Sequence, residues 1–232
     1  MTPAAFLHEL EARIAKYDLL CHPFYKAWSA GELTRDDLRE YAQDYFPHVE
    51  AFPAYLAQLA VRLEDGELRK NILANMADEK GSHDARPDAT PHSDMWLDFA
   101  EGMGASRDQR GHKTVPAMKK LISFFDRVSA TGSVEQALAA FYAFESQVPR
   151  IAKEKARGLK ELYGADAKTY SYFTLHETAD LYHSQVWRDQ LVARIEANQD
   201  TAQAALDSAE TAAKALWSAL DGIYEKRMAL AA

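Results

Sequence analysis

The stretch HETADLYH, residues 176–183, places two histidines and an aspartate at a spacing that suits metal binding. At about 100° per residue in an α-helix, Asp180 lies about 40° and His183 about 20° around the helix axis from His176. A single helix would therefore present all three side chains on one face. Such a face can form half of a metal site, but a buried histidine bonded to a backbone carbonyl gives the same pattern.

Three further residues have the chemistry to complete a metal site. Glu145 interrupts the apolar stretch LAAFYAFESQVP, where a carboxylate that faces the core needs a metal or another cation as its partner. Arg150 or Lys153 could be that cation. Glu79 ends the predicted helix NILANMADEK, and His92 begins the next helix in PHSDMWLDF, so both lie at the ends of neighbouring helices.

The six residues together suit a pair of metal ions. Three carboxylates and three imidazoles, without a thiolate, favour two divalent ions of the iron or manganese type. The three carboxylates carry three negative charges and two divalent ions carry four positive charges. The remaining positive charge leaves room for a hydroxide or oxygen-derived bridge. The first pair of ligands has alternatives, because Asp78 is as available as Glu79, and His83, four residues after Glu79, is a rival of His92.

A long amphipathic helix is predicted from Thr34 to about Leu63, because apolar residues recur there every three or four positions. Thr34 and Asp37 match a capping box, which bonds the first free amides of a helix. Pro47 and Pro53 fall inside this helix. Since proline lacks an amide hydrogen and crowds the preceding turn, we expect a kink or a break there.

The rest of the chain shows the same helical periodicity and no sustained strand alternation. Further helices are predicted at about 67–79, 91–102, 115–130, 133–163 and 166–198, and from 201 onwards. The sequence therefore predicts an all-α bundle of seven to eight helices, which forms a single domain over residues 1–232.

Composition argues against several other classes of protein. The net charge of −8 disfavours a nucleic-acid partner, because phosphate binding needs a clustered excess of lysine and arginine. The single cysteine, Cys21, excludes an intrachain disulfide and a cysteine-based zinc cluster. The N-terminus lacks a signal-peptide pattern and no apolar run reaches membrane-spanning length, so we expect a cytoplasmic protein that does not bind membranes.

Five motifs together resemble a known family: CHPFYKAW, DEKG at a helix end, HSDMWLDF, ESQVPRIAKEK and HETADLYH. They are similar to the Chlamydia protein associating with death domains and its bacterial relatives. This family has the haem-oxygenase-like fold of the pyrroloquinoline quinone biosynthesis oxidase and the TenA thiaminases. Members of its dimetal branch are oxidases, and the family's ligand pattern falls on Glu79, His92, Glu145, His176, Asp180 and His183.

The resemblance implies that the protein makes para-aminobenzoate, the aromatic amine of folate, by cutting it from one of its own tyrosines. Tyr25 matches the sacrificed tyrosine, and Lys155 matches the lysine that gives the amino group. The implied cofactors are two divalent redox metals, either two irons or iron with manganese, together with dioxygen and an external reductant. Without the resemblance, Tyr25 would be a core aromatic and Lys155 a solvated lysine on a helix.

One position departs from the family pattern. A tyrosine precedes the middle ligand glutamate in the family, where this chain has Phe144. A second redox tyrosine would then be Tyr142, two positions earlier, or Tyr172, four positions before the last motif. Tyr41 and Tyr45 on the long helix are further candidates, although aromatic residues on a helix face usually belong to the core.

Three classes of function stay open. The first is the self-sacrificing dimetal oxidase, and the second is an enzyme of the same fold that acts on a separate small aromatic molecule. Within the second class a TenA-like hydrolase is disfavoured, because it needs a nucleophilic cysteine in the middle of the chain and only Cys21 is present. The third is a binding module for a protein partner. We also expect a homodimer, which is common in this fold.

Overall fold

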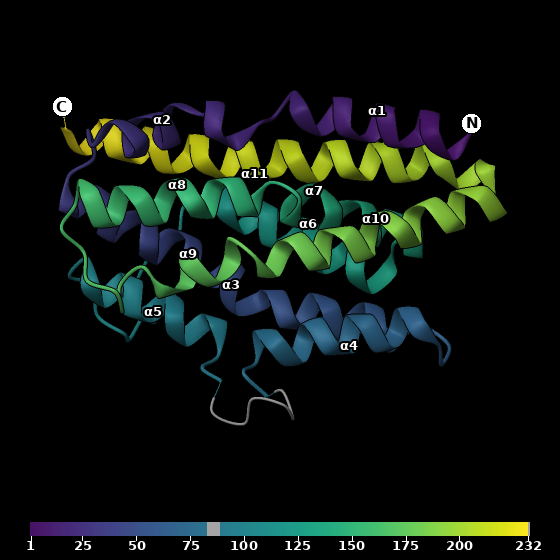
Figure 1. The fold of residues 1–232 in the computed structure, drawn as a ribbon. Helices are drawn as coiled ribbons and strands as arrows, with labels where there is room; N and C mark the ends of the chain where they lie inside the picture. The colour runs from purple at the N-terminus through teal and green to yellow at the C-terminus, as the bar shows by residue number, and fades with distance from the viewer. Residues whose placement is uncertain (83–88, 232) are drawn as a thin grey trace.

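The computed structural model describes residues 1–82 and 89–231 and confirms the all-α prediction, with no strand in that part of the chain (Figure 1). Over these residues it has eleven α-helices, rather than the predicted seven to eight, and two short 3₁₀ helices. The α-helices are α1 (Pro3–Ala15), α2 (Pro23–Ala30), α3 (Arg35–Ala60), α4 (Glu67–Glu79), α5 (His92–Gly102), α6 (Pro116–Thr131), α7 (Val134–Glu145), α8 (Val148–Glu161), α9 (Ser171–His176), α10 (Ala179–Ala197) and α11 (Ala202–Ala231).

The helix predicted at 133–163 is in fact two helices, α7 and α8. The first ends at Glu145 and the second begins at Val148. Pro149, in the first turn of α8, has no amide hydrogen to donate to the carbonyl of Glu145, so a continuous helix would lose a hydrogen bond there. This break places Glu145 at a helix end.

The helix predicted at 166–198 is also divided, into α9 and α10. The first ends at His176 and the second begins at Ala179. Between them, the Thr178 hydroxyl donates to the Leu175 carbonyl at 3.3 Å. The backbone amides here bond three positions back, Thr178 to the Leu175 carbonyl and Leu181 to the Thr178 carbonyl, each at 3.2 Å, so the α-helical pattern is interrupted.

The long helix α3 begins as predicted, with the capping box of Thr34 and Asp37. It continues through both Pro47 and Pro53, so of the expected kink or break the break is wrong. Helix α3 packs against α4, α5 and α6, and Pro53 is itself buried. These tertiary contacts maintain the helix where the local sequence favours an interruption.

The helices surround a core rich in aromatic side chains. Helices α1 and α11 run along one side of the bundle, and α4 and α5 along the opposite side (Figure 1). Helix α11 packs mainly on α7 and α6. Trp28, Trp96 and Trp187 are almost completely buried in the core. None of the described helices has both the length and the apolar character of a membrane span.

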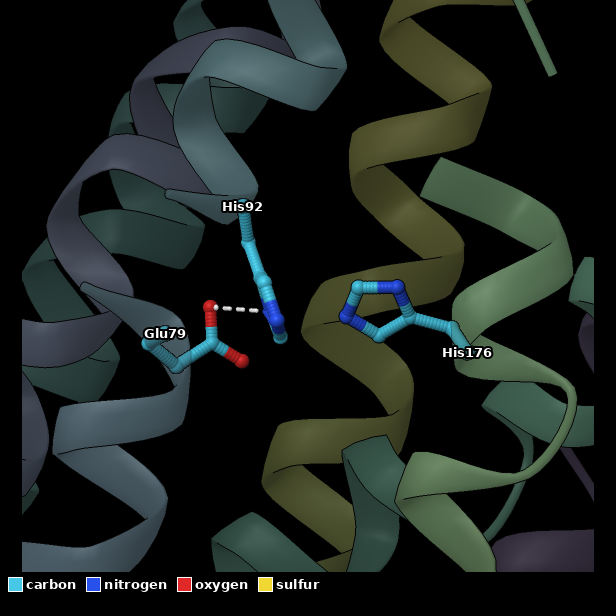
Figure 2. A group of neighbouring side chains, drawn as sticks. All are labelled: Glu79, His92 and His176. Carbon is cyan, nitrogen blue, oxygen red and sulfur yellow. Dashed lines mark ion pairs between the residues drawn. The ribbon is translucent and has the colours of Figure 1, made fainter. Parts of the chain in front are cut away.

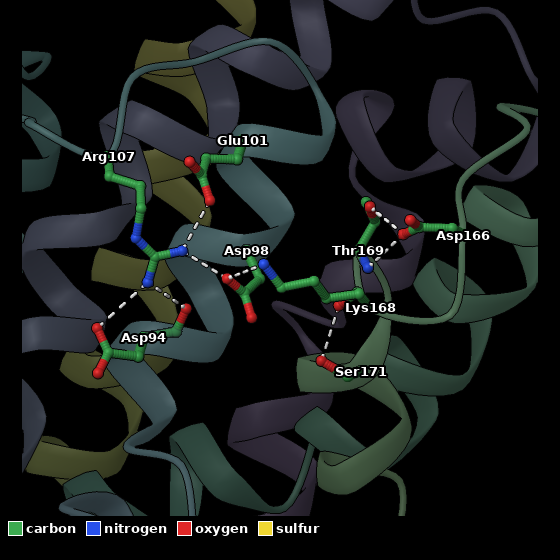
Figure 3. A network of polar contacts seen from close by, with 8 residues as sticks. All are labelled: Asp94, Asp98, Glu101, Arg107, Asp166, Lys168, Thr169 and Ser171. Carbon is green, nitrogen blue, oxygen red and sulfur yellow. Dashed lines mark hydrogen bonds and ion pairs between the residues drawn. The ribbon is translucent and has the colours of Figure 1, made fainter.

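A polar network joins the end of α5 to the loop that precedes α9 (Figure 3). Asp98 on α5 pairs with Arg107 at 2.5 Å and with Lys168 at 3.0 Å. The two segments approach so closely that a Cβ atom on Gly102 would lie 2.2 Å from the Thr169 Oγ1 atom. Only glycine fits at this position without a shift of one segment. The network and the close approach together hold α9 against α5.

Candidate metal centre

Three helix ends meet at the first group of candidate ligands, which we call the Glu79 cluster: Glu79, His92 and His176. Glu79 is the last residue of α4, His92 the first of α5 and His176 the last of α9 (Figure 2). One ligand atom from each residue lies within 4.8 Å of the others, and all three side chains are buried. Two histidines and one carboxylate form a ligand set that is typical of non-haem iron in oxygenases.

The side chains of the Glu79 cluster are oriented toward a common point. The Nδ1 atom of His92 lies 3.0 Å from a Glu79 oxygen but lacks the geometry of a hydrogen bond. His176 donates from Nδ1 to the Tyr172 carbonyl at 2.7 Å, because a carbonyl can only accept. This bond fixes the tautomer and leaves Nε2, which faces His92, without a proton and able to bind a metal (Figure 2).

The second group, the Glu145 cluster, consists of Glu145, Asp180 and His183. Glu145 ends α7, while the other two lie in the first turns of α10. Their ligand atoms also lie within 4.8 Å of one another, and all three residues are buried. Asn75 donates to one Glu145 oxygen at 3.2 Å, and the Trp187 indole donates to the other. These bonds hold the carboxylate in place, as outer contacts do at metal sites.

The stripe predicted on one helix is therefore divided between two clusters. We expected His176, Asp180 and His183 to project from a single helix, and this is wrong because α9 ends at His176. The interruption sends His176 to the Glu79 cluster and the other two to the Glu145 cluster.

The structure also distinguishes among the alternative ligands. Glu79 joins His92, while the Asp78 carboxylate lies 3.8 Å from the Nε2 atom of His183. His83 lies outside the described residues. Arg150 pairs with Asp18 at 3.3 Å and is not the partner of Glu145.

Burial and charge shift the pKa values in both clusters. Burial raises the pKa of Glu145. Burial alone would also raise that of Glu79, but the neighbouring His92 holds the Glu79 pKa below its ordinary value. Burial would lower the pKa of His183, yet Asp180 and the other nearby carboxylates raise it well above its ordinary value. Carboxylates taken out of water in this way need cations, and divalent metals between these ligands would supply that charge.

A third group of possible ligands, Glu40, Asp44 and His112, has a different partner. The Lys226 ammonium lies 2.9 Å from both Glu40 and Asp44, and His112 lies 2.9 Å from Asp44. The lysine therefore supplies the positive charge at this site, which joins α11 to α3.

A small cavity connects the two clusters to Tyr25 and Lys155. Its wall includes Glu79 and His176 from one cluster and Glu145 from the other. The cavity volume is about 40 Å³. Because one water molecule needs about 10–15 Å³, the cavity has room for a few waters but not for an aromatic ring.

Tyr25 and Lys155 both line this cavity, and both are buried. The Lys155 Nζ atom is 4.4 Å from the centre of the Tyr25 ring. The Tyr41 hydroxyl joins them, because it accepts from Lys155 at 2.5 Å and lies 3.0 Å from the Tyr25 hydroxyl. Burial lowers the pKa of Lys155 well below its ordinary value. Lys155 is therefore not the solvated lysine that its position on a helix suggests.

The two tyrosines expected as redox relays occupy different places. Tyr172 lines the cavity, and its ring stacks on His176 with the ring centres 4.0 Å apart. Tyr142 lies on α7 in a surface groove beside Arg150 and is not part of the cavity wall. Tyr45 does line the cavity. Tyr172 and Tyr45 therefore share the cavity wall with candidate ligands, which Tyr142 does not, and are the better candidates for a redox tyrosine.

One cavity residue, His48 on α3, was not predicted. It is completely buried, and burial lowers its pKa to about 3. Its spacing of three from Tyr45 and four from Phe52 puts it on the apolar face of α3, which could have identified it as a buried polar residue.

The all-helical fold and the two buried clusters together define a candidate non-haem metal enzyme, and the sequence comparisons identify its family. The model for iron-containing redox enzymes matches residues 39–217. The chain therefore belongs to the family of iron-containing redox enzymes.

Individual relatives agree with the family and the fold. The 4-aminobenzoate synthase of Chlamydia muridarum is 36% identical over 222 residues, which are 95% of this chain and 90% of the relative. That of Nitrosomonas europaea is 35% identical over 240 residues, covering 97% and 93%. A TenA homologue from Pseudomonas syringae has a TM-score of 0.75 at 16% identity, covering 96% and 92%. The resemblance and the haem-oxygenase-like fold predicted from the sequence are both confirmed.

Proposed function

We propose that this protein is a dimetal oxidase that makes 4-aminobenzoate, also called para-aminobenzoate, from its own Tyr25 with nitrogen from Lys155. The observation that carries the proposal is the position of the Lys155 Nζ atom, 4.4 Å from the centre of the Tyr25 ring. Both residues line the cavity that also borders the two clusters. The relatives named 4-aminobenzoate synthase support the identity of the product.

The reaction requires three changes to the Tyr25 side chain. The Cα–Cβ bond is broken, Cβ becomes the carboxyl carbon, and the phenolic oxygen is replaced by nitrogen. The ring itself is kept. The nitrogen transfer breaks the ring C–O bond of Tyr25 and the Cε–Nζ bond of Lys155, releases the phenolic oxygen as water and leaves Cε as an aldehyde. The cleavage of the Cα–Cβ bond and the changes at Cβ and Cε are oxidations, so the proposal includes dioxygen as the oxidant and an external reductant. Two iron ions, or iron with manganese, bound by the two clusters would supply the redox chemistry.

The residues around Tyr25 suit this role. Burial of Lys155 favours its neutral amine, which has the free electron pair needed to bond to carbon. Burial also raises the pKa of Tyr25, so its phenol keeps its proton at neutral pH. The Tyr41 hydroxyl, which accepts from Lys155, holds the amine beside the ring. The small apolar cavity limits the number of water molecules beside the ring, which protects reactive species from side reactions.

The size of the cavity argues against a separate aromatic substrate. About 40 Å³ of free space accommodates a few water-sized molecules, whereas the Tyr25 ring is already part of the wall. A cysteine-dependent hydrolase is also disfavoured, because Cys21 is exposed and does not line the cavity.

The test asks whether the aromatic ring of the product comes from Tyr25. Protein grown with ring-labelled tyrosine and supplied with iron, manganese, dioxygen and a reductant should release labelled 4-aminobenzoate. Tyr25→Phe should bind metal as the unaltered protein does but release at least tenfold less product, because phenylalanine lacks the phenolic oxygen that eases oxidation. Mass spectrometry should locate the lost mass in the peptide that contains Tyr25.

Tyr182→Phe is the control, since this tyrosine is 67% exposed. It should release as much product as the unaltered protein. Unlabelled product from fully labelled protein would contradict the proposal and indicate an oxidase that acts on a separate molecule.

A further inference from the structure

His48 is the buried polar side chain that the proposed reaction leaves unexplained. It is 0% exposed and lines the same cavity as Glu79 and Glu145. Neither ring nitrogen has a hydrogen-bond partner among the described residues. A neutral imidazole carries one donor and one acceptor, and leaving a buried donor or acceptor unpaired is unfavourable for folding.

The rings that pack around His48 make no hydrogen bond to these nitrogens. The imidazole is surrounded by five aromatic rings with centres between 5.1 and 6.3 Å away: Tyr45, Phe52, Tyr55, Phe125 and Phe144. Phe144 is the nearest of these and has no hydroxyl group. The Tyr55 hydroxyl makes no hydrogen bond to the imidazole. The cavity that His48 lines gives a polar ligand access to the imidazole.

A second buried histidine shows how this chain treats an imidazole with a structural role. His22 is also 0% exposed, but both of its nitrogens are bonded. Its Nε2 lies 3.0 Å from an Asp221 oxygen, and its Nδ1 accepts from the Phe24 amide at 3.0 Å. His48 has no such contacts, so its polarity is not explained by the fold alone.

The dimensions of the cavity restrict the missing partner. The free space of about 40 Å³ admits ligands of the size of water or dioxygen. We propose that His48 binds a small oxygen ligand of one or two heavy atoms in the cavity, by donating a hydrogen bond to it from the imidazole. His48 would then be a positioning residue that holds this ligand beside the two clusters and the Tyr25 ring. This role rests on the proposed dimetal function.

The first test measures ligand binding with nitric oxide, a two-atom analogue of dioxygen, on the iron-loaded protein. His48→Leu should keep the metal content but weaken nitric oxide binding about 3- to 10-fold, the loss that one hydrogen bond represents. The N–O stretching frequency should also shift and lose its sensitivity to deuterated solvent. His48→Gln, which keeps a donor, should restore part of the affinity. Unchanged affinity and frequency would overturn the proposal, and so would loss of metal, which would make His48 a ligand.

The second test uses thermal unfolding of the metal-free protein. His48→Leu removes two unpaired nitrogens, so its midpoint should stay the same or rise by a few degrees. His22→Leu is the matched control and should lower the midpoint by about 4 °C or more, because it leaves the Phe24 amide unbonded. A similar fall for His48→Leu would show that the imidazole is structural.

Failure of the proposed function can be distinguished from failure of this inference. If the unaltered protein binds no metal, the dimetal function fails. A crystal structure of that protein would still decide the role of His48, through the presence or absence of an ordered water within about 3.2 Å of its ring.

Discussion

Lys155 has an environment that is unusual for a lysine. It is 6% exposed, and in the described part of the chain its amine bonds the Tyr41 hydroxyl and no carboxylate. Its Nζ atom instead faces aromatic rings, at 4.4 Å from Tyr25 and 4.7 Å from Tyr41. Ring faces attract an ammonium group, but burial disfavours the charged form and lowers the pKa well below its ordinary value.

Because the pKa of Lys155 is lowered in the folded state, this lysine should make the free energy of unfolding depend on pH. Between the lowered pKa of the folded state and the ordinary value of 10.5, the unfolded chain binds more protons than the folded one. The free energy of unfolding therefore rises with pH in this window, by at most about 1.4 kcal/mol per pH unit. Lys155→Met should lose this rise in urea unfolding measured from pH 7 to 10.

Lys155→Met should also fail to release 4-aminobenzoate while it still binds metal. Lys153→Met, a change at an exposed lysine on the same helix, is the control and should keep both the pH profile and the product. A parallel pH profile for the unaltered protein and Lys155→Met would contradict the assignment of a neutral buried amine.

At the scale of elements, the ends of the helices position most of the candidate metal ligands. Four of the six candidate ligands lie at the terminal residue of a helix, where the chain changes direction. Helix ends can bring side chains from several directions to one point, whereas one helix face sends them in parallel. The position of α9 relative to α5 therefore controls the geometry of the Glu79 cluster.

Gly102→Ala tests this control. The added Cβ would lie 2.2 Å from Thr169, so α5 and the loop before α9 must separate. Overpacking of this kind costs about 1–3 kcal/mol. Replacing glycine inside a helix gains at most about 1 kcal/mol, and Gly102 is the last residue of α5, so the cost outweighs the gain. We expect a lower free energy of unfolding and a selective loss of one metal.

Gly111→Ala is the control, because a Cβ at Gly111 meets open space. Metal analysis and urea unfolding of the two variants would measure the difference. Equal metal content in both would contradict the link between this contact and the Glu79 cluster.

At the scale of the whole molecule, five helices from distant parts of the chain contribute to the two clusters: α4, α5, α7, α9 and α10. Metal ions that bind only the folded chain stabilise it by mass action, by about 4 kcal/mol when free metal exceeds its dissociation constant a thousandfold. Removal of the metals should therefore lower the unfolding midpoint by about 8–16 °C.

A substitution in one cluster should remove the metal of that cluster and leave the other metal bound. His176→Ala and Glu145→Gln should each lose about one of two metal equivalents, because they alter different clusters. His112→Ala should lose none, since Lys226 already supplies the charge at that site. Metal analysis after purification without chelator measures the three contents. Full occupancy in both cluster variants would contradict the ligand assignments.

The sequence was sufficient for the features that depend on neighbouring residues. Periodicity predicted the all-α class, and the capping box of Thr34 and Asp37 was placed correctly. The six candidate ligands were selected by residue type, spacing and resemblance, and the structure brings them together. Each of these patterns reflects interactions within a few positions along the chain or motifs that relatives share.

Only the tertiary structure decided the features that depend on residues distant in sequence. Contacts with three other helices keep α3 continuous through its prolines, against the local preference. The burial of Lys155, the unbonded nitrogens of His48 and the small size of the cavity arise where helices from the whole chain meet. Burial is a property of the surroundings, and no local pattern in a sequence measures how many other segments will cover a side chain.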